Sequence, residues 1–128
     1  MTAAFEQRQH RGKQSYAAGQ AAEGIVERHY QAGGYQILAR RWRGKAGEID
    51  LICISGQTVV FVEVKKARTF DIAAYRLGPR QLSRLARAGT EYIGRDCGLE
   101  RVLMRFDLAL VDGIGDVRVI ENLSFDGW

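Results

Sequence analysis

The sequence lacks several features that would place it in a specialised class of protein. Its two cysteines, Cys53 and Cys97, are far apart and form no C-x-x-C motif, so we expect neither a disulfide framework nor a zinc site. No run of about 20 apolar residues is present to cross a membrane. The N-terminal stretch has no apolar segment and does not resemble a secretory signal. These absences favour a cytoplasmic protein with no membrane association, in which Cys53 is a buried free thiol.

What the sequence does contain is typical of one globular domain. Its 128 residues are 46% hydrophobic and 27% charged, which is enough for a single hydrophobic core. The stretch MTAAFEQRQHRGKQSY contains a mix of Arg, Lys, Gln and Ser, and we predict a flexible tail over residues 1–14. The remainder, residues 15–128, is expected to form one domain.

The net charge of +4 is unevenly distributed along the chain. Residues 1–47 and residues 66–95 each carry a net charge of +5, whereas residues 48–65 carry −2 and residues 96–128 carry −4. Basic segments on both sides of an acidic centre suit a polyanion such as nucleic acid. A solvated surface without a binding role would give the same pattern.

Hydrophobic periodicity predicts a mixed α/β domain with elements in the order α-β-β-β-α-β-β. The first helix is expected over residues 16–31, ended by Gly33 and Gly34. The only proline, Pro79, marks the start of a second helix that runs to residue 93. Strands are expected at residues 35–42, 47–54, 58–66, 102–111 and 116–121. The inward stripes are Ala18, Ala22, Ile25, Val26 and His29 on the first helix, and Leu82, Leu85, Gly89 and Tyr92 on the second.

The second and third strands carry charged residues where strand interiors are normally apolar. Strand alternation puts Glu48 and Asp50 on one face of the second strand, and Glu63 and Lys65 on one face of the third. A two-residue turn at Gly56 and Gln57 would set Asp50 opposite Glu63, and Glu48 opposite Lys65. A turn shifted to Ser55 and Gly56 keeps all four on one face, whereas a three-residue loop without a bulge separates them.

Opposed carboxylates repel each other, and a divalent cation reverses the sign of that interaction. Asp50 and Glu63 would provide carboxylate ligands for Mg²⁺ or Mn²⁺, and the carbonyl of Val64 could add another. Lys65 would orient or deprotonate a water molecule on the ion, or neutralise the pentavalent phosphate. This pattern predicts phosphodiester hydrolysis with Asp50, Glu63 and Lys65 as catalytic residues. The alternative is a surface set of salt bridges, with Glu48 and Lys65 as an ordinary cross-strand pair.

Four segments of the chain resemble the YraN-like family of predicted endonucleases. They are GEIDLI (residues 47–52), VVFVEVKKAR (59–68), GQAAEGIVERHYQAGGYQIL (19–38) and RFDLALV (105–111). That family is grouped with the PD-(D/E)XK, or restriction-endonuclease-like, superfamily, whose core order is αβββαβ. The resemblance therefore implies an α/β fold with this core and a mixed central sheet flanked by helices.

The resemblance also implies roles for particular residues. Asp50 would be the motif aspartate, with Glu63 and Lys65 as the E-x-K pair. Glu23, on the first helix, corresponds to the acid that resolvase-like members bring to the metal. Two further residues are possible accessories: Glu48, which belongs to the GEIDLI motif, and Gln81, which lies where some superfamily nucleases carry a helical Gln or Lys.

Taken together, the residues and the resemblance predict a metal-dependent endonuclease that acts on DNA, with branched or damaged DNA as one class of substrate. No motif for reading bases is present, so the protein is expected to contact phosphates. The arginines expected to do so are Arg40, Arg41, Arg43, Arg68, Arg80, Arg84 and Arg87. Two alternatives stay open: a nucleic-acid-binding module that keeps the acidic cluster without cutting, and a domain whose acidic C-terminal segment docks a basic partner.

Overall fold

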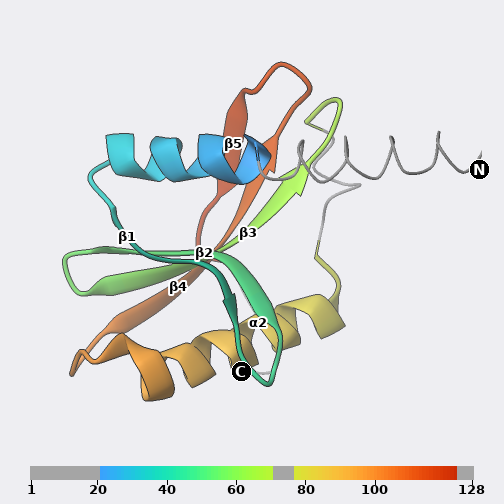
Figure 1. The fold of residues 1–128 in the computed structure, drawn as a ribbon. Helices are drawn as coiled ribbons and strands as arrows, with labels where there is room; N and C mark the ends of the chain where they lie inside the picture. The colour runs from blue at the N-terminus through green and yellow to red at the C-terminus, as the bar shows by residue number, and fades with distance from the viewer. Residues whose placement is uncertain (1–20, 71–76, 124–128) are drawn as a thin grey trace, which may run out of the picture.

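The computed structural model describes residues 21–70 and 77–123, which form a sheet between two helices (Figure 1). The first helix, residues 21–32, covers one face of the sheet, and α2 (Pro79–Tyr92) covers the other. A short π-helix, η2 (Ile93–Cys97), continues α2. The tail predicted for residues 1–14 lies outside the described residues, as do residues 16–20, where the first helix was expected to begin, and residues 71–76 before α2. None of the described helices is long and apolar enough to cross a membrane.

The sheet has five strands in the order β1-β2-β3-β4-β5. β3 and β4 pair in parallel, whereas the other neighbours are antiparallel. The parallel pair requires a crossover connection, which α2 provides between β3 and β4. This arrangement confirms the predicted mixed sheet and the αβββαβ order. The strand bounds are β1 (Gln36–Arg43), β2 (Glu48–Ser55), β3 (Thr58–Lys66), β4 (Leu103–Val111) and β5 (Val117–Ile120).

The first helix packs on the sheet through Ala22, Val26 and Tyr30, which are spaced four residues apart and are almost fully buried. They meet Cys53, which is buried with a free thiol as predicted, and neighbouring valines of β3. The prediction that His29 faces inward is wrong, because this side chain is exposed. Tyr30 takes the inward position, since it lies on the same helical face as Val26.

The second helix packs on the opposite face of the sheet, and its predicted inward stripe is confirmed. Leu85, Gly89 and Tyr92 are buried there. Gly89 allows the close approach, because a Cβ at this position would lie 2.9 Å from the ring of Phe106 and 3.1 Å from that of Phe61. The two rings are stacked with their centroids 5.2 Å apart, so neither can move aside easily.

Candidate active site

The register of the β2–β3 hairpin is the one predicted from the two-residue turn. Ser55 pairs with Thr58 across that turn, and Gly56 adopts a φ of 60° that favours glycine. The pairing continues to Leu51 and Val62 and ends there. Asp50 and Glu63 are the next residues in this register, immediately beyond the last pair. The predicted cross-strand pairing of Glu48 with Lys65 does not form, because the two strands have stopped pairing before those positions.

Asp50 bridges the place where the ladder ends. Its carboxylate accepts a hydrogen bond of 2.8 Å from the backbone N–H of Val64, so a side chain takes the role that a main-chain carbonyl has in a regular ladder. Burial raises the pKa of Asp50 to about 6, and the neighbouring charge of Glu63 contributes to this rise. Glu23 and Glu48 raise the pKa further, whereas the Val64 N–H lowers it. Asp50 thus lies within the electrostatic reach of three other carboxylates.

The neighbouring acids are partly neutralised by basic side chains of the protein itself. Glu63 lies 3.3 Å from the ammonium of Lys65, and Glu23 accepts a hydrogen bond of 2.7 Å from Arg41. Glu48 pairs at 3.2 Å with Arg43, its partner residue in β1. The alternative of a Glu48–Lys65 surface pair is therefore not what forms.

The donors around Asp50 fit a hard divalent cation by their chemistry. Carboxylate and carbonyl oxygens are the ligands that Mg²⁺ and Mn²⁺ take. Burial raises the pKa of Asp50 most, and the charges of Glu63, Glu23 and Glu48 raise it further, so Asp50 lies in a negatively charged environment. Within residues 21–70 and 77–123, however, no three His, Cys, Asp or Glu side chains are grouped so that they could hold a metal ion.

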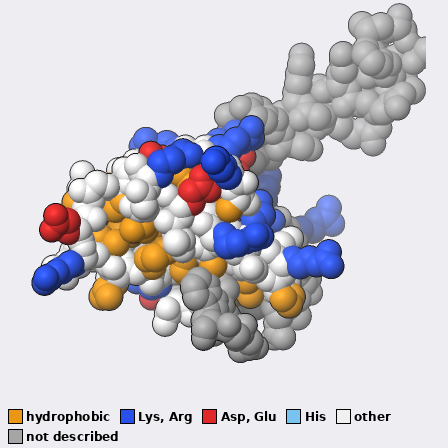
Figure 2. Space-filling view, turned by 90° about the horizontal axis from the view of Figure 1, so that it is seen from below, with side chains coloured by type: hydrophobic (Ala, Val, Ile, Leu, Met, Phe, Trp, Pro, Cys, Tyr) orange, Lys and Arg blue, Asp and Glu red, His pale blue; other side chains and the backbone are white. Residues whose placement is uncertain are grey.

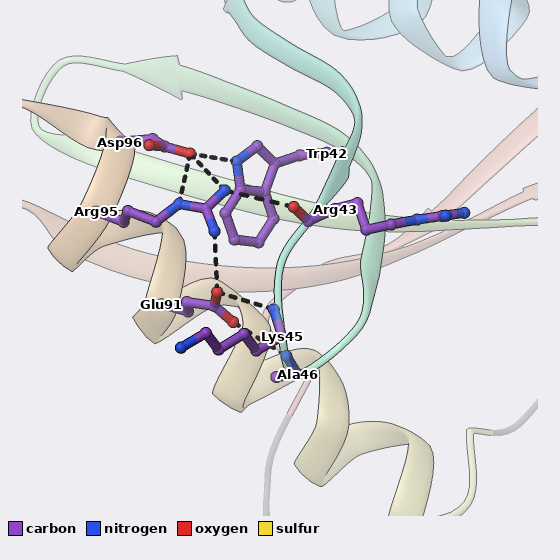
Figure 3. Close-up of polar contacts among 7 residues, drawn as sticks. All are labelled: Trp42, Arg43, Lys45, Ala46, Glu91, Arg95 and Asp96. Atoms are coloured by element: carbon purple, nitrogen blue, oxygen red, sulfur yellow. Dashed lines mark hydrogen bonds and ion pairs between the residues drawn. The ribbon is translucent and has the colours of Figure 1, made fainter.

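A clamp of polar side chains fixes the connection that leads into β2 (Figure 3). The carboxylate of Glu91, on α2, accepts hydrogen bonds of 2.9 and 3.0 Å from the backbone N–H groups of Lys45 and Ala46. These two bonds lower the pKa of Glu91. Arg95 donates to Glu91 and lies over the ring of Trp42, 4.8 Å from its centroid. The connection is thereby held to the end of α2, which positions the start of β2 and hence Asp50.

The same clamp includes the short helix η2. The indole N–H of Trp42 donates to the carboxylate of Asp96 at 2.6 Å, and Arg95 donates to the same carboxylate at 3.1 Å. Both contacts lower the pKa of Asp96. β1 is therefore attached to α2 and η2 in two ways: through the Trp42 side chain, and through the loop that follows the strand.

A second network, which the sequence analysis missed, attaches the first helix to β4. Asp107 is fully buried and accepts a hydrogen bond of 2.6 Å from the hydroxyl of Tyr30. Arg105 donates to both carboxylate oxygens of Asp107 and to the hydroxyl of Tyr35. Burial and the bond to Asp107 raise the pKa of Tyr30 above its usual range. In the RFD segment, strand alternation puts Arg105 and Asp107 on the same face of the strand. This spacing could have predicted their ion pair from the sequence.

The predicted phosphate-binding arginines are distributed over both faces of the sheet. Arg40 and Arg41 contact the first helix through Glu27 and Glu23, whereas Arg80, Arg84 and Arg87 lie on α2. Figure 2, seen from the α2 side, shows Lys and Arg side chains as more prominent than acidic ones. Arg84 is the one of these three that packs beside Gly47, since a Cβ there would lie 3.1 Å from its side chain.

The structure also shows where Arg68 and Gln81, two further predicted site residues, lie. Arg68 is exposed just after β3. The side-chain oxygen of Gln81 accepts a hydrogen bond of 3.4 Å from the backbone N–H of Gly78, so it caps the start of α2. This contact gives Gln81 a role in helix capping.

The fold defines the class of the protein: a mixed sheet with an αβββαβ order, flanked by helices on both faces, is a restriction-endonuclease-like core. The chain belongs to the family described as "Uncharacterised protein family UPF0102", whose sequence model matches residues 22–111. This is the YraN-like family that the motifs indicated.

Several bacterial relatives resemble almost the whole chain. A UPF0102 protein of Ruegeria pomeroyi is 50% identical over 112 residues, which is 88% of this chain and 91% of the relative. One of Roseobacter denitrificans is 44% identical over 94% of this chain and 93% of its own length. A third, from Cereibacter sphaeroides, is 47% identical over 87% of this chain and 95% of its own length.

Proposed function

We propose that the protein is a metal-dependent nuclease that hydrolyses phosphodiester bonds of DNA at the end of the β2–β3 ladder. The observation that carries this proposal is the environment of Asp50. Its carboxylate is half-buried and oriented by the Val64 N–H, and burial together with the neighbouring acids raises its pKa to about 6. Clustered acids around a half-buried carboxylate do not stabilise a sheet, whereas a cation site uses such an arrangement.

Four groups would hold Mg²⁺ or Mn²⁺: the carboxylates of Asp50, Glu63 and Glu23, and the carbonyl of Val64. When bound, the ion would supply positive charge to the reacting phosphate and lower the pKa of a water ligand. The Val64 N–H would keep Asp50 oriented for this task. Lys65, which already lies beside Glu63, would orient the attacking water or neutralise charge that develops on the phosphate.

Arginines and accessory residues would position the DNA backbone. Arg84 packs beside Gly47, which precedes β2, and is therefore the α2 arginine best placed to contact a phosphate near Asp50. More distant phosphates would be bound by Arg40, Arg43, Arg68, Arg80 and Arg87. Glu48 would act by orienting Arg43, with which it pairs. Contacts limited to phosphates favour a preference for the shape of the DNA over its sequence, as in cleavage of branched DNA.

The decisive experiment is a cleavage assay with Mg²⁺ or Mn²⁺ on linear, nicked, branched and single-stranded DNA. Asp50→Ala, Glu63→Ala and Lys65→Ala are each expected to abolish cleavage and to leave the circular dichroism spectrum unchanged. Glu23→Gln should weaken cleavage. Glu27→Gln is the matched control, because Glu27 lies one turn further along the same helix and should have no effect. If no substrate is cut, or the three alanine variants cut as well as the wild type, the enzymatic proposal fails.

A second candidate function is a nucleic-acid-binding module that does not cut. The observation that favours it is that Glu63 and Glu23 are paired with Lys65 and Arg41. Basic side chains of the protein itself therefore balance part of the negative charge of the acidic cluster. This candidate predicts salt-sensitive DNA binding that depends little on divalent metal and yields no products. Retention of DNA together with absence of cleavage by the wild type would favour it over the nuclease.

A further inference from the structure

Arg41 has a backbone conformation that residues other than glycine rarely adopt. Its φ is 47°, in the middle of strand β1. This left-handed conformation brings the Cβ too close to the following carbonyl oxygen. Strain of this kind persists only where the surrounding structure maintains it, and it is concentrated at active sites and ligand clamps. The conformation of Arg41 therefore calls for a local explanation.

This conformation interrupts the alternation of β1 side chains between the two faces of the sheet. In a regular strand, Arg40 and Arg41 would extend to opposite faces of the sheet. Here both guanidinium groups contact the first helix, where Arg40 pairs with Glu27 and Arg41 pairs with Glu23. The two acids are four residues apart and lie on one side of that helix. The strained backbone thus brings a second arginine to a helix that one arginine already contacts.

The two ion pairs differ in their surroundings. The Arg40–Glu27 pair is exposed, whereas the Arg41–Glu23 pair is partly buried. Glu23 is one of the acids that act on Asp50. Arg41 itself lies across from Asp50, because its neighbours Arg40 and Trp42 pair with Leu51 and Ile49 on either side of it. Only the second pair therefore belongs to the acidic cluster.

We propose that Arg41 is an internal counter-ion of the metal site, which holds Glu23 in the metal-free protein and must release it when a divalent cation binds. This inference rests on the proposed function, since it assumes that Glu23 becomes a ligand. A cation and a guanidinium compete for the same carboxylate oxygens and repel each other. Arg41 therefore lowers the affinity for the metal and acts as a positioning residue for Glu23.

Release of Arg41 also has a consequence for the substrate. Arg41 lies across from Asp50 in the strand register, so its guanidinium could then turn toward a phosphate bound at the ion. A guanidinium can bind two phosphate oxygens at once through parallel N–H bonds. Arg41 would thus exchange a carboxylate for a phosphate as the site is loaded, which suits the phosphodiester substrate of the proposed function.

The test compares three variants by calorimetric titration with Mn²⁺. Arg41→Asn removes the charge and suits the backbone, because Asn tolerates a positive φ. We expect it to bind Mn²⁺ roughly threefold to tenfold more tightly than the wild type. Arg41→Lys keeps the charge, and Arg40→Asn removes a neighbouring charge that pairs with Glu27. Both controls should bind within about twofold of the wild type.

A second measurement uses the wild-type protein and so does not depend on how any variant folds. The side-chain Nε–H signals of Arg40 and Arg41 are followed by NMR during a titration with Mg²⁺. Both groups donate to a glutamate in the metal-free structure. We expect the Arg41 signal to shift as Mg²⁺ binds and the Arg40 signal to stay.

The outcomes separate this inference from the proposed function. Unchanged Mn²⁺ affinity in Arg41→Asn, equal tightening in Arg40→Asn, or an Arg41 signal that does not move at saturating Mg²⁺ would each overturn the counter-ion role. In those cases, loss of Mn²⁺ binding in Asp50→Ala would still uphold the metal site. Failure of the wild type to bind Mn²⁺ at all would instead remove the metal site itself.

Discussion

The carboxylate of Asp50 and the backbone N–H of Val64 are joined by a hydrogen bond of 2.8 Å across the point where β2 and β3 stop pairing. Burial and neighbouring carboxylates raise the pKa of Asp50 to about 6, whereas the usual value for Asp is about 4. The folded metal-free protein thus binds this proton more tightly than the unfolded chain does. Ionised Asp50 therefore lowers stability above pH 6, and this cost disappears below about pH 4.

Asp50→Asn should stabilise the metal-free protein at neutral pH. The amide oxygen of Asn can still accept the Val64 hydrogen bond, but the buried charge is gone. We expect the free energy of unfolding at pH 7.5 to rise by about 1 to 3 kcal/mol, and the gain to vanish near pH 4. Urea denaturation at both pH values checks this, with Glu100→Gln as a control at an exposed acid. A gain of equal size at both pH values would contradict the assignment to a raised pKa.

The affinity for a divalent metal should depend on whether Asp50 is protonated. A divalent cation binds the ionised carboxylate, so protons compete with it below the pKa of Asp50. We expect the dissociation constant for Mn²⁺ to be constant above pH 7 and to increase by about tenfold per pH unit below pH 6. Calorimetric titrations between pH 5 and pH 8 measure this profile. A flat profile across that range would show that Asp50 is not a ligand.

Tyr30→Phe should destabilise the protein, because it removes the hydroxyl that donates to the fully buried Asp107. We expect a loss of about 1 to 3 kcal/mol in the free energy of unfolding. Tyr35→Phe is the comparison, since its hydroxyl contacts Arg105 and the residue is only half-buried, and it should cost less. Urea denaturation measures both. Equal losses would mean that the network does not centre on Asp107.

Glu91→Ala should loosen the connection between β1 and β2 without unfolding the protein. The amides of Lys45 and Ala46 lose the carboxylate that accepts their hydrogen bonds. We expect their hydrogen exchange to accelerate by about tenfold or more, while amides in the centre of β3 are unaffected. Exchange followed by NMR resolves the two groups. If Lys45 and Ala46 exchange at the wild-type rate, the clamp of Figure 3 does not restrain this loop.

Gly89→Ala should destabilise the protein, whereas Gly94→Ala should not. A Cβ at residue 89 would lie 2.9 Å from the Phe106 ring, whereas one at residue 94 would meet nothing within 4 Å. Alanine is favoured over glycine in helices by about 1 kcal/mol, but overpacking costs about 1 to 3 kcal/mol. We expect thermal unfolding to show a lower midpoint for Gly89→Ala and an equal or higher one for Gly94→Ala. A higher midpoint for both would contradict the close approach of α2 to the sheet.

Local patterns predicted much of the fold. The strand bounds and the order of elements followed from periodicity, and the single Pro79 located the start of α2. The hairpin register followed from one two-residue turn at Gly56, since turn geometry and register are coupled over a few residues. His29 was misplaced because helical spacing from Ala22 leaves two adjacent positions near the core. The contact between Tyr30 and the sheet decided between them.

The candidate site was predictable only in part. The sequence by itself determined that Asp50 and Glu63 occupy neighbouring positions in the hairpin, because strand alternation and turn length act locally. Only the tertiary structure decided which basic side chains pair with the acids of the site, and where the pairing of β2 with β3 ends. The Arg41–Glu23 pair depends on a left-handed residue within a strand, and the Tyr30–Asp107 bond joins residues 77 positions apart. Such contacts arise from the packing of the first helix on the whole sheet, which no local pattern encodes.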